Sequence, residues 1–471
     1  MGVSFFGIFS KDQAFMFTLP GLLALLVAHY TKVHEISASL RPLPIINFLY
    51  LGACFGLLLD IRLGHVRQEA CPQLRLVFPL CLWTLVTVVL SGGLLAREIT
   101  PTLTYMLLFL LIAQGVQSFR ALRIVGLSIL AISLFLGVVA FIQALNPFQC
   151  ILLTADGNGS VADRSEGRPC ESAAVCREDA EPGEDYRCER PGPLNTTSIA
   201  HGRVRYRGNL EDPNELALAL VIALPFAMLT FAQRRSLPRL LLLVAAFAIT
   251  LPVVVWSASR TGQTAFIAVV AVYLVQQVKW KGLLAAAILA APALLLGGRS
   301  GGEADLSALE RLEAWSAGMD MLKSSPVWGI GKSQFGEHHN ITAHNSFVLG
   351  AAELGLIGIV LWIGVLYTCF KIAILAIRRY RGRPEGALPC AWARSLLASL
   401  CGIVVGTNFL SLSFHPVLWA FFALSGAYYL AVRRHDPEFR VVFGARDLLA
   451  VTGFAILYLV GVVGYLKVRG V

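Results

Sequence analysis

Three arginines alternate with other residues near the middle of the chain, and their spacing suits the binding of an anion. Arg203, Arg205 and Arg207 precede residues 212–214, Asp-Pro-Asn, which lead into an apolar stretch. A guanidinium group presents paired N–H donors that match two phosphate oxygens, so a phosphate or diphosphate would satisfy this arrangement. Asp followed by Pro is also typical of a helix start. The alternative is a basic rim whose charges are paired with neighbouring carboxylates: Glu211, Asp212 and Glu215.

Two further arginines lie downstream at the ends of apolar stretches. Arg260 belongs to the sequence Ser-Ala-Ser-Arg-Thr-Gly of residues 257–262. An unpaired arginine at a membrane boundary is costly, so a ligand or a structural salt bridge has to compensate it. Arg311 begins the polar side of residues 309–323, which we expect to form an amphipathic helix at a membrane surface. The apolar residues of that segment fall at helical spacing: Leu312, Trp315, Met319 and Leu322.

His344 is the candidate general base. Asn345 opens the next helical stretch, so His344 should lie at a helix N-terminus, where the dipole keeps the imidazole neutral. A neutral histidine beside arginines can take a proton from a hydroxyl nucleophile. The simpler alternative is a histidine that only caps or packs. His338 and His339 we expect in a solvated loop.

The elements that carry these residues belong to a membrane protein. The chain is 56% hydrophobic and 14% charged, whereas soluble domains are roughly a quarter charged. Apolar runs near the ~20 residues needed to span a bilayer recur along the chain. We therefore predict an all-α polytopic bundle of about twelve or thirteen transmembrane helices, rather than a large soluble protein. The predicted spans are Phe15–Tyr30, Ile45–Leu59, Leu76–Leu95, Leu103–Val116, Ile124–Leu145, Leu216–Phe231, Leu240–Trp256, Thr264–Val278, Leu283–Leu296, Gly355–Ile377, Leu396–Leu410, Val417–Val432 and Leu448–Leu466.

Basic residues in alternate short loops predict the orientation. They are Arg62, Arg67, Arg75, Arg120, Arg123, Arg234, Arg235, Arg239, Lys279, Lys281, Arg378, Arg379, Arg381, Arg383, Arg433, Arg434 and Arg440. Short cytoplasmic loops are enriched in Lys and Arg, so the net charge of +10 reflects topology rather than nucleic-acid binding. The long hydrophilic segments Asn146–Pro213 and Gly297–Ala343 then lie outside. The predicted organisation is membrane helices (1–145), outer loop (146–213), membrane helices (214–296), outer catalytic loop (297–354) and membrane helices (355–471).

Four of the ten cysteines lie in the first outer segment: Cys150, Cys170, Cys176 and Cys188. An even number of cysteines in a polar segment predicts two disulfides in an oxidising compartment, with the pairing left open. Metal ligation is the alternative, but the spacing lacks a C-x-x-C pair. No metal site is therefore expected.

Residues from Arg205 to Gly358 resemble the O-antigen ligase and polymerase family. The ligase-type pattern H-[NSQ]-x9-G-x-x-[GTY] is met by His344, Asn345, Gly355 and Gly358. The other similarities are Arg205-Tyr206-Arg207-Gly208, Asp212-Pro213-Asn214, Ser259-Arg260 and the stretch with Arg311, Trp315, Pro326, Gly329, Gly331 and Phe335. The first five spans match only in hydropathy. The cysteine-rich insertion and a thirteenth span depart from the family pattern.

The resemblance implies a glycosyltransferase that uses a polyprenyl diphosphate donor. The donor would be a glycan on undecaprenyl diphosphate, and the site would face the periplasm from a bacterial inner membrane. Carried over, Arg205 or Arg207, Arg260 and Arg311 would hold the diphosphate. His344 would act as the base or orient the acceptor, so His344 and Arg260 are the expected catalytic residues. Transfer would invert the anomeric centre without a metal ion or other cofactor.

The expected acceptor is a glycolipid or glycan hydroxyl, and its identity separates the remaining alternatives. A ligase transfers to lipid A–core, which we favour, and a polymerase joins O-antigen or exopolysaccharide repeats with the same chemistry. Transfer to protein side chains is a third possibility on this scaffold. A flippase or transporter would need charged residues near the midplane of its spans and discontinuous helices. The predicted spans are almost free of charge, which disfavours transport.

Overall fold

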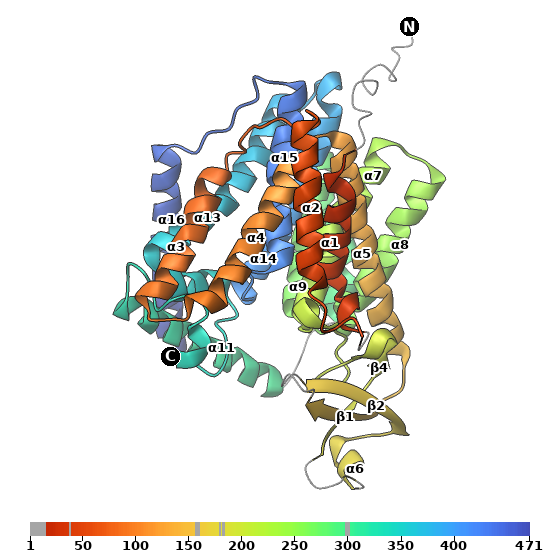
Figure 1. Ribbon diagram of the computed structural model, residues 1–471. Helices are drawn as coiled ribbons and strands as arrows, with labels where there is room; N and C mark the ends of the chain where they lie inside the picture. The colour runs from red at the N-terminus through yellow and green to blue at the C-terminus, as the bar shows by residue number, and fades with distance from the viewer. Residues whose placement is uncertain (1–15, 37–38, 156–160, 179, 181–183, 297–301) are drawn as a thin grey trace.

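The protein is a bundle of long helices with a small β-sheet at one end (Figure 1). The computed structural model describes residues 16–36, 39–155, 161–178, 180, 184–296 and 302–471. Within these residues, ten helices are long and apolar enough to cross a membrane, and α1 and α3 are shorter apolar helices. The predicted all-α polytopic fold is confirmed. The bundle helices are α1 (Thr18–Thr31), α2 (Ile45–Arg62), α3 (Leu74–Leu90), α4 (Leu95–Gly115), α5 (Phe119–Leu145), α7 (Pro213–Gln233), α8 (Leu237–Trp256), α9 (Arg260–Val278), α10 (Lys281–Leu296), α13 (Ser346–Tyr380), α14 (Ala387–Phe409), α15 (Pro416–His435) and α16 (Ala445–Arg469).

Each predicted span overlaps one of these helices, although four boundaries fall outside them. Val116 and Leu410 each lie one residue beyond the end of a helix, and the other two boundaries differ more. Phe15, the expected start of the first span, lies outside the described residues. The predicted span Leu76–Leu95 is wrong at its end, because α3 stops at Leu90 and Leu95 already belongs to α4. Gly92 has a φ of 73°, a left-handed conformation that glycine adopts without strain and that turns the chain here. The residues on both sides of this turn are apolar, so the hydropathy of the sequence does not show where α3 ends.

Two helices form the centre of the bundle. The apolar windows of α7 and α15 are 83% and 94% buried, whereas those of α2, α8 and α16 are each 22% buried. An apolar face left exposed on a helix of this length is typical of contact with lipid. The central helix α7 begins at Pro213, directly after its cap Asp212. The candidate site is therefore attached to the most enclosed part of the molecule.

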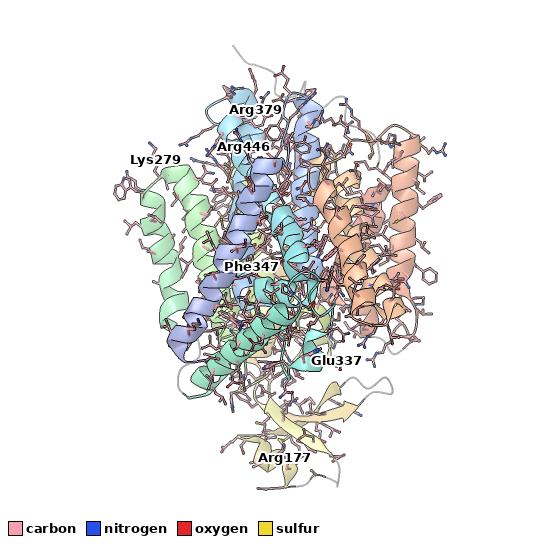
Figure 2. The ribbon with its side chains drawn as sticks, turned by 90° about the vertical axis from the view of Figure 1, so that its left-hand side faces the viewer. Arg177, Lys279, Glu337, Phe347, Arg379 and Arg446 are labelled. Carbon is pink, nitrogen blue, oxygen red and sulfur yellow. A yellow bond between two sulfur atoms is a disulfide. The ribbon has the colours of Figure 1, made fainter. Side chains whose placement is uncertain are left out.

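The two ends of the bundle differ in composition. Lys279, Arg379 and Arg446 lie at one end, and Arg177 and Glu337 lie at the other (Figure 2). The second end also carries the β-sheet and α11 (Gly302–Ser324), which crosses beneath the bundle helices (Figure 1). The segment predicted as an amphipathic helix is therefore helical. A second, short helix follows α11 in the same hydrophilic segment: α12 (Phe335–His338).

The first long hydrophilic segment folds into a small disulfide-linked unit. Strands β1 (Gln149–Ala155), β2 (Val161–Pro169) and β3 (Asp185–Glu189) form an antiparallel sheet in the order β2-β1-β3. The short helix α6 (Ala173–Arg177) packs on β3, and β4 (Pro191–Gly192) pairs with β5 (Thr196–Thr197). The core of this unit is small, and its buried side chains among the described residues are Cys150, Cys176 and Tyr186. Disulfides commonly stabilise units of this size.

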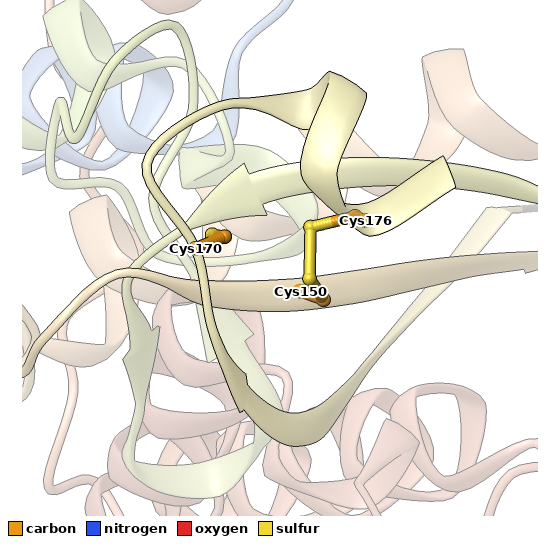
Figure 3. A group of neighbouring side chains, drawn as sticks. All are labelled: Cys150, Cys170 and Cys176. Carbon is orange, nitrogen blue, oxygen red and sulfur yellow. A yellow bond between two sulfur atoms is a disulfide. The ribbon is translucent and has the colours of Figure 1, made fainter. Parts of the chain in front are cut away.

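The four cysteines of this unit form two disulfides, Cys150–Cys176 and Cys170–Cys188. Cys150 lies on β1 and is bonded to Cys176 on α6, with Cys170 close by (Figure 3). Cys150 faces Cys188 in the β1–β3 register, yet each is bonded to another partner. A disulfide leaves no thiolate for a metal, so this pairing argues against the metal-site alternative.

Non-reducing mass spectrometry should recover these two bonds as separate linked peptides. Cleavage after Glu166, Glu171 and Glu178 places the four cysteines on four different peptides, so the Cys150–Cys176 and Cys170–Cys188 bonds become distinguishable. Free Cys54 and Cys401 provide the control, because they should be alkylated without reduction. Peptides that link Cys150 to Cys188, or alkylation at any of the four positions before reduction, would contradict the pairing.

Candidate active site

An extended segment before α7 directs its arginines away from the helix core. Val204 and Tyr206 are 0% and 2% exposed, and alternate residues of an extended chain face opposite sides. The arginines between them are held by backbone carbonyls. Arg203 Nε donates to Ser257 O at 2.8 Å, and Arg205 Nε donates to Thr197 O at 3.0 Å. The guanidinium groups are thus fixed in orientation.

Three helix N-termini carry residues of the site. Asp212 Oδ1 accepts from Asn214 N at 2.7 Å and caps α7, which confirms the predicted helix start. Ser259 Oγ accepts from Gly262 N at 2.8 Å, so Arg260 is the first residue of α9. Asn345 caps α13 directly after His344. Helix N-termini carry partial positive charge and free N–H groups, which favour an anion.

A break in α13 explains the glycines of the ligase-type pattern. Gly355 has a φ of 65° and interrupts the helix, so the nine-residue segment after Asn345 is a separate short helix. The loop at 326–331 takes up the interrupted hydrogen bonds: Ile330 N donates to Ala352 O at 2.9 Å, and Leu356 N donates to Pro326 O at 2.8 Å. A Cβ on Gly355 would lie 2.2 Å from Val327 O, so a larger residue would force these backbones apart. The break aims the N-terminus of α13 at the site.

Two adjacent cavities bring the predicted residues together. The larger has a volume of about 350 Å³ and is lined by Ile199, Ala200, Arg203, Arg205, Glu211, Asp212, Pro213, Asn214, Ser307, Glu310, Arg311, Ile341 and His344. The smaller, of about 70 Å³, is lined by Arg203, Asn214, Ala258, Arg260, Thr261, Ser307, Ala308 and Arg311. The two share four of these residues. Together they are called the arginine cavities.

Charge divides the arginine cavities into two parts. The smaller has three arginines and, among the described residues that line it, no carboxylate. The larger combines arginines with His344 and the carboxylates of Glu211, Asp212 and Glu310. The smaller is therefore suited to an anion, and the larger to proton transfer. Trp315 Nε1 donates to Ala343 O at 2.8 Å and so ties α11, which carries Arg311, to the residue before His344.

Of the predicted site residues, Arg205, Arg260, Arg311 and His344 line these cavities and Arg207 does not. The Arg207 guanidinium donates to Leu194 O, and to Asn195 O at 2.9 Å.

Arg203 lines both cavities but is absent from the predicted phosphate ligands. Arg203 lies two positions before Arg205, and this alternation in the sequence could have identified it as a cavity residue.

Burial lowers the pKa of the His344 imidazole below its ordinary value of 6.5, and the nearby charge of Arg311 lowers it further. The carboxylates of Asp212 and Glu310 oppose this shift without reversing it. The imidazole is therefore neutral near pH 7. It can accept a proton from a hydroxyl group in the larger cavity.

The rate of the reaction in which His344 acts as the base should fall at acid pH with a midpoint below 6.5, because a protonated imidazole cannot accept a proton. Arg311 lowers the pKa of His344, so Arg311→Gln should raise that pKa and move the acid limb of residual activity to higher pH. The measurement is kcat/KM against pH for both proteins. An acid limb above 6.5 in the unmodified protein would contradict this assignment.

Residues 216–363 match the family model for O-antigen ligase. This part of the chain is similar to the O-antigen ligase family. This finding confirms the family that the sequence motifs resemble. No curated protein matches the chain.

The residues matched by the family model include nine of the seventeen that line the arginine cavities. Arg260, Arg311 and His344 lie within the matched residues, whereas Arg205 and Arg207 precede them. Enzymes of this type are glycosyltransferase-like and act on lipid-linked glycans. The family therefore agrees with a site that combines anion binding with a neutral base.

Proposed function

We propose that this chain transfers a glycan from undecaprenyl diphosphate to a sugar hydroxyl of lipid A–core. The observation that carries the proposal is the convergence of Arg203, Arg205, Arg260 and Arg311 with neutral His344. Three helix N-termini meet at the same cavities and favour a diphosphate. The similarity to the O-antigen ligase family supports the same reaction class.

The reaction proceeds by displacement at the anomeric carbon of the donor. His344 takes the proton of the acceptor hydroxyl as its oxygen bonds to that carbon. The bond from the carbon to the diphosphate oxygen breaks, and the electron pair leaves with the diphosphate. Arg260 and Arg311 stabilise the charge that develops on this leaving group. Attack from the side opposite the leaving group inverts the anomeric centre.

We further propose that the site faces the periplasm from the bacterial inner membrane. Labelled basic residues of the short loops, Lys279 and Arg379, lie at the end opposite the sheet, which supports a cytoplasmic position for that end. The two disulfides of the sheet unit are consistent with an oxidising compartment. Both observations support a periplasmic position for the arginine cavities, the side on which we propose that the lipid-linked donor binds.

The test is the glycan phenotype of a strain that lacks this chain. A ligase defect should remove the lipopolysaccharide ladder and leave long polymer on undecaprenyl diphosphate. Accumulation of single repeats would instead indicate a polymerase, with the same residues serving a lipid-linked acceptor. An unchanged ladder and an unchanged pool of lipid-linked glycan would refute both transfer reactions.

A further inference from the structure

A third cavity, of about 410 Å³, borders the same loops as the two arginine cavities. It is lined by Tyr105, Asn209, Lys332, Ser333, Phe335, Gly336, Thr342, Leu349, Glu353, Ser411, Phe414, His415 and Pro416. None of these residues lines the arginine cavities. Its volume falls within the roughly 300–1,000 Å³ of ordinary ligand pockets. We call it the hydroxyl-lined cavity, after Ser333, Thr342 and Ser411.

Two short segments separate the hydroxyl-lined cavity from the arginine cavities. In one, Ile341 and His344 line the arginine side, while Thr342 lines the other. In the second, Asp212 lines the arginine side and Asn209 the other. The loop that carries the candidate base therefore borders both cavities. Thr342 on one side and His344 on the other are only two positions apart in this loop.

The hydroxyl-lined cavity has no excess of positive charge. Among the described residues that line it, the charged ones are Lys332 and Glu353, and Lys332 forms a buried ion pair with Glu98. His415 Nδ1 accepts from Val417 N at 3.2 Å, so Nε2 carries the proton and donates to Asn209 O at 2.7 Å. The imidazole is thus in its neutral form. A diphosphate has no reason to prefer this cavity over the arginine cavities.

The remaining lining groups are those that bind sugars. The hydroxyls of Thr342 and Ser411 lie 2.6 Å apart and can each donate and accept. Phe414 stacks on Trp419 with ring centroids 6.4 Å apart, and Tyr105 lies 5.9 Å from Phe414. Tyr105 and Phe414 give the cavity aromatic surface against which the C–H face of a pyranose can pack, beside groups that bind its hydroxyls.

We propose that the hydroxyl-lined cavity binds the terminal, uncharged sugars of the acceptor and directs one of their hydroxyl groups past residues 341–343 to His344. This inference rests on the proposed transfer reaction, which needs a second substrate beside the donor. Placing donor and acceptor on opposite sides of one loop also lets the hydroxyl approach the anomeric carbon away from the leaving diphosphate.

The kinetic test uses the full-length chain in detergent, with lipid-linked glycan and rough lipopolysaccharide extracted from the deletion strain. Phe414→Leu removes the stacking face and should raise the KM for the acceptor on the order of tenfold, with the donor KM unchanged. Thr342→Val keeps the side-chain shape and should also raise the KM for the acceptor. It provides the test if Phe414→Leu fails to fold. Phe55→Leu on α2 is the matched control, because Phe55 is 63% exposed on the outside of the bundle.

A rise in the donor KM alone would overturn the inference and assign the cavity to the donor sugar. Unchanged constants in both variants would also overturn it.

Binding of the delipidated core oligosaccharide, followed by saturation-transfer NMR, separates this inference from the transfer reaction itself. The unmodified chain and Arg311→Ala should both give signals, and Phe414→Leu should weaken them. Signals without any transfer by the unmodified chain would sustain the sugar cavity and refute the proposed function. Transfer without signals, or signals unaffected by Phe414→Leu, would refute the sugar cavity alone.

Discussion

His344→Asn should reduce glycan transfer by about 10²–10⁴-fold, the range that a positioned general base contributes. Asparagine is the preferred replacement because residue 344 has a φ of 46°, and asparagine tolerates this left-handed conformation better than most residues. It preserves the loop but cannot accept a proton at neutral pH. The measurement is the rate of transfer at saturating donor and acceptor. His344→Ala should give a similar loss of activity with a greater cost in stability.

The matched control for this change is His338→Asn. His338 is exposed, and its Nδ1 lies 3.0 Å from Gln334 O in the same outer segment. We expect this variant to keep nearly full activity. Binding of undecaprenyl diphosphate should persist in His344→Asn, because the arginines are untouched. Near-normal transfer by His344→Asn would reject the base assignment, and loss of diphosphate binding would instead indicate a structural role.

Arg311→Ala and Arg260→Ala should each lower the transfer rate by about 10²–10³-fold, comparable to the removal of one group that stabilises transition-state charge. Both arginines line the small cavity that has no carboxylate among its described lining residues. Each should also weaken the binding of undecaprenyl diphosphate. Arg311→Lys should recover only part of the loss, because lysine keeps the charge but lacks the two-pronged geometry of a guanidinium.

The repeated arginines before α7 provide an internal comparison. Arg205 lines the larger arginine cavity, whereas Arg207 donates to the backbone of Leu194 and Asn195. We therefore expect Arg205→Ala to lose transfer and diphosphate binding, and Arg207→Ala to lose much less. Arg381→Ala, an exposed change in a basic loop, is the control for charge alone. The reverse order of effects would assign the phosphate contact to Arg207.

The close packing around the break in α13 limits which variants can serve as controls in these tests. Gly329 and Gly355 both have positive φ, and their backbones approach so closely that a Cβ on Gly329 would lie 2.4 Å from Glu353 C. A larger residue at either position should misplace the N-terminus of α13 without changing a catalytic group. Such variants would mimic loss of His344, so they are unsuitable as controls for the chemistry.

Local features of the sequence determined most of the fold. A helix in a membrane satisfies its own backbone hydrogen bonds, so hydropathy over about 20 residues is enough to locate each span. The caps Asp212 and Ser259 also act within three residues of their own position, which makes the starts of α7 and α9 readable. The family likeness predicted roles for Arg260, Arg311 and His344, since its motifs preserve residue order.

Only the tertiary structure decided which of these residues meet. The choice of Arg203 and Arg205 over Arg207 depends on carbonyls at Leu194, Thr197 and Ser257, which reach the segment through the fold. The disulfide pairing depends on how α6 lies over β1, and register alone would pair Cys150 with Cys188. The hydroxyl-lined cavity joins residues as distant as Tyr105 and Phe414. These outcomes rest on contacts between segments far apart in the chain, and spacing along the sequence carries no information about such distances.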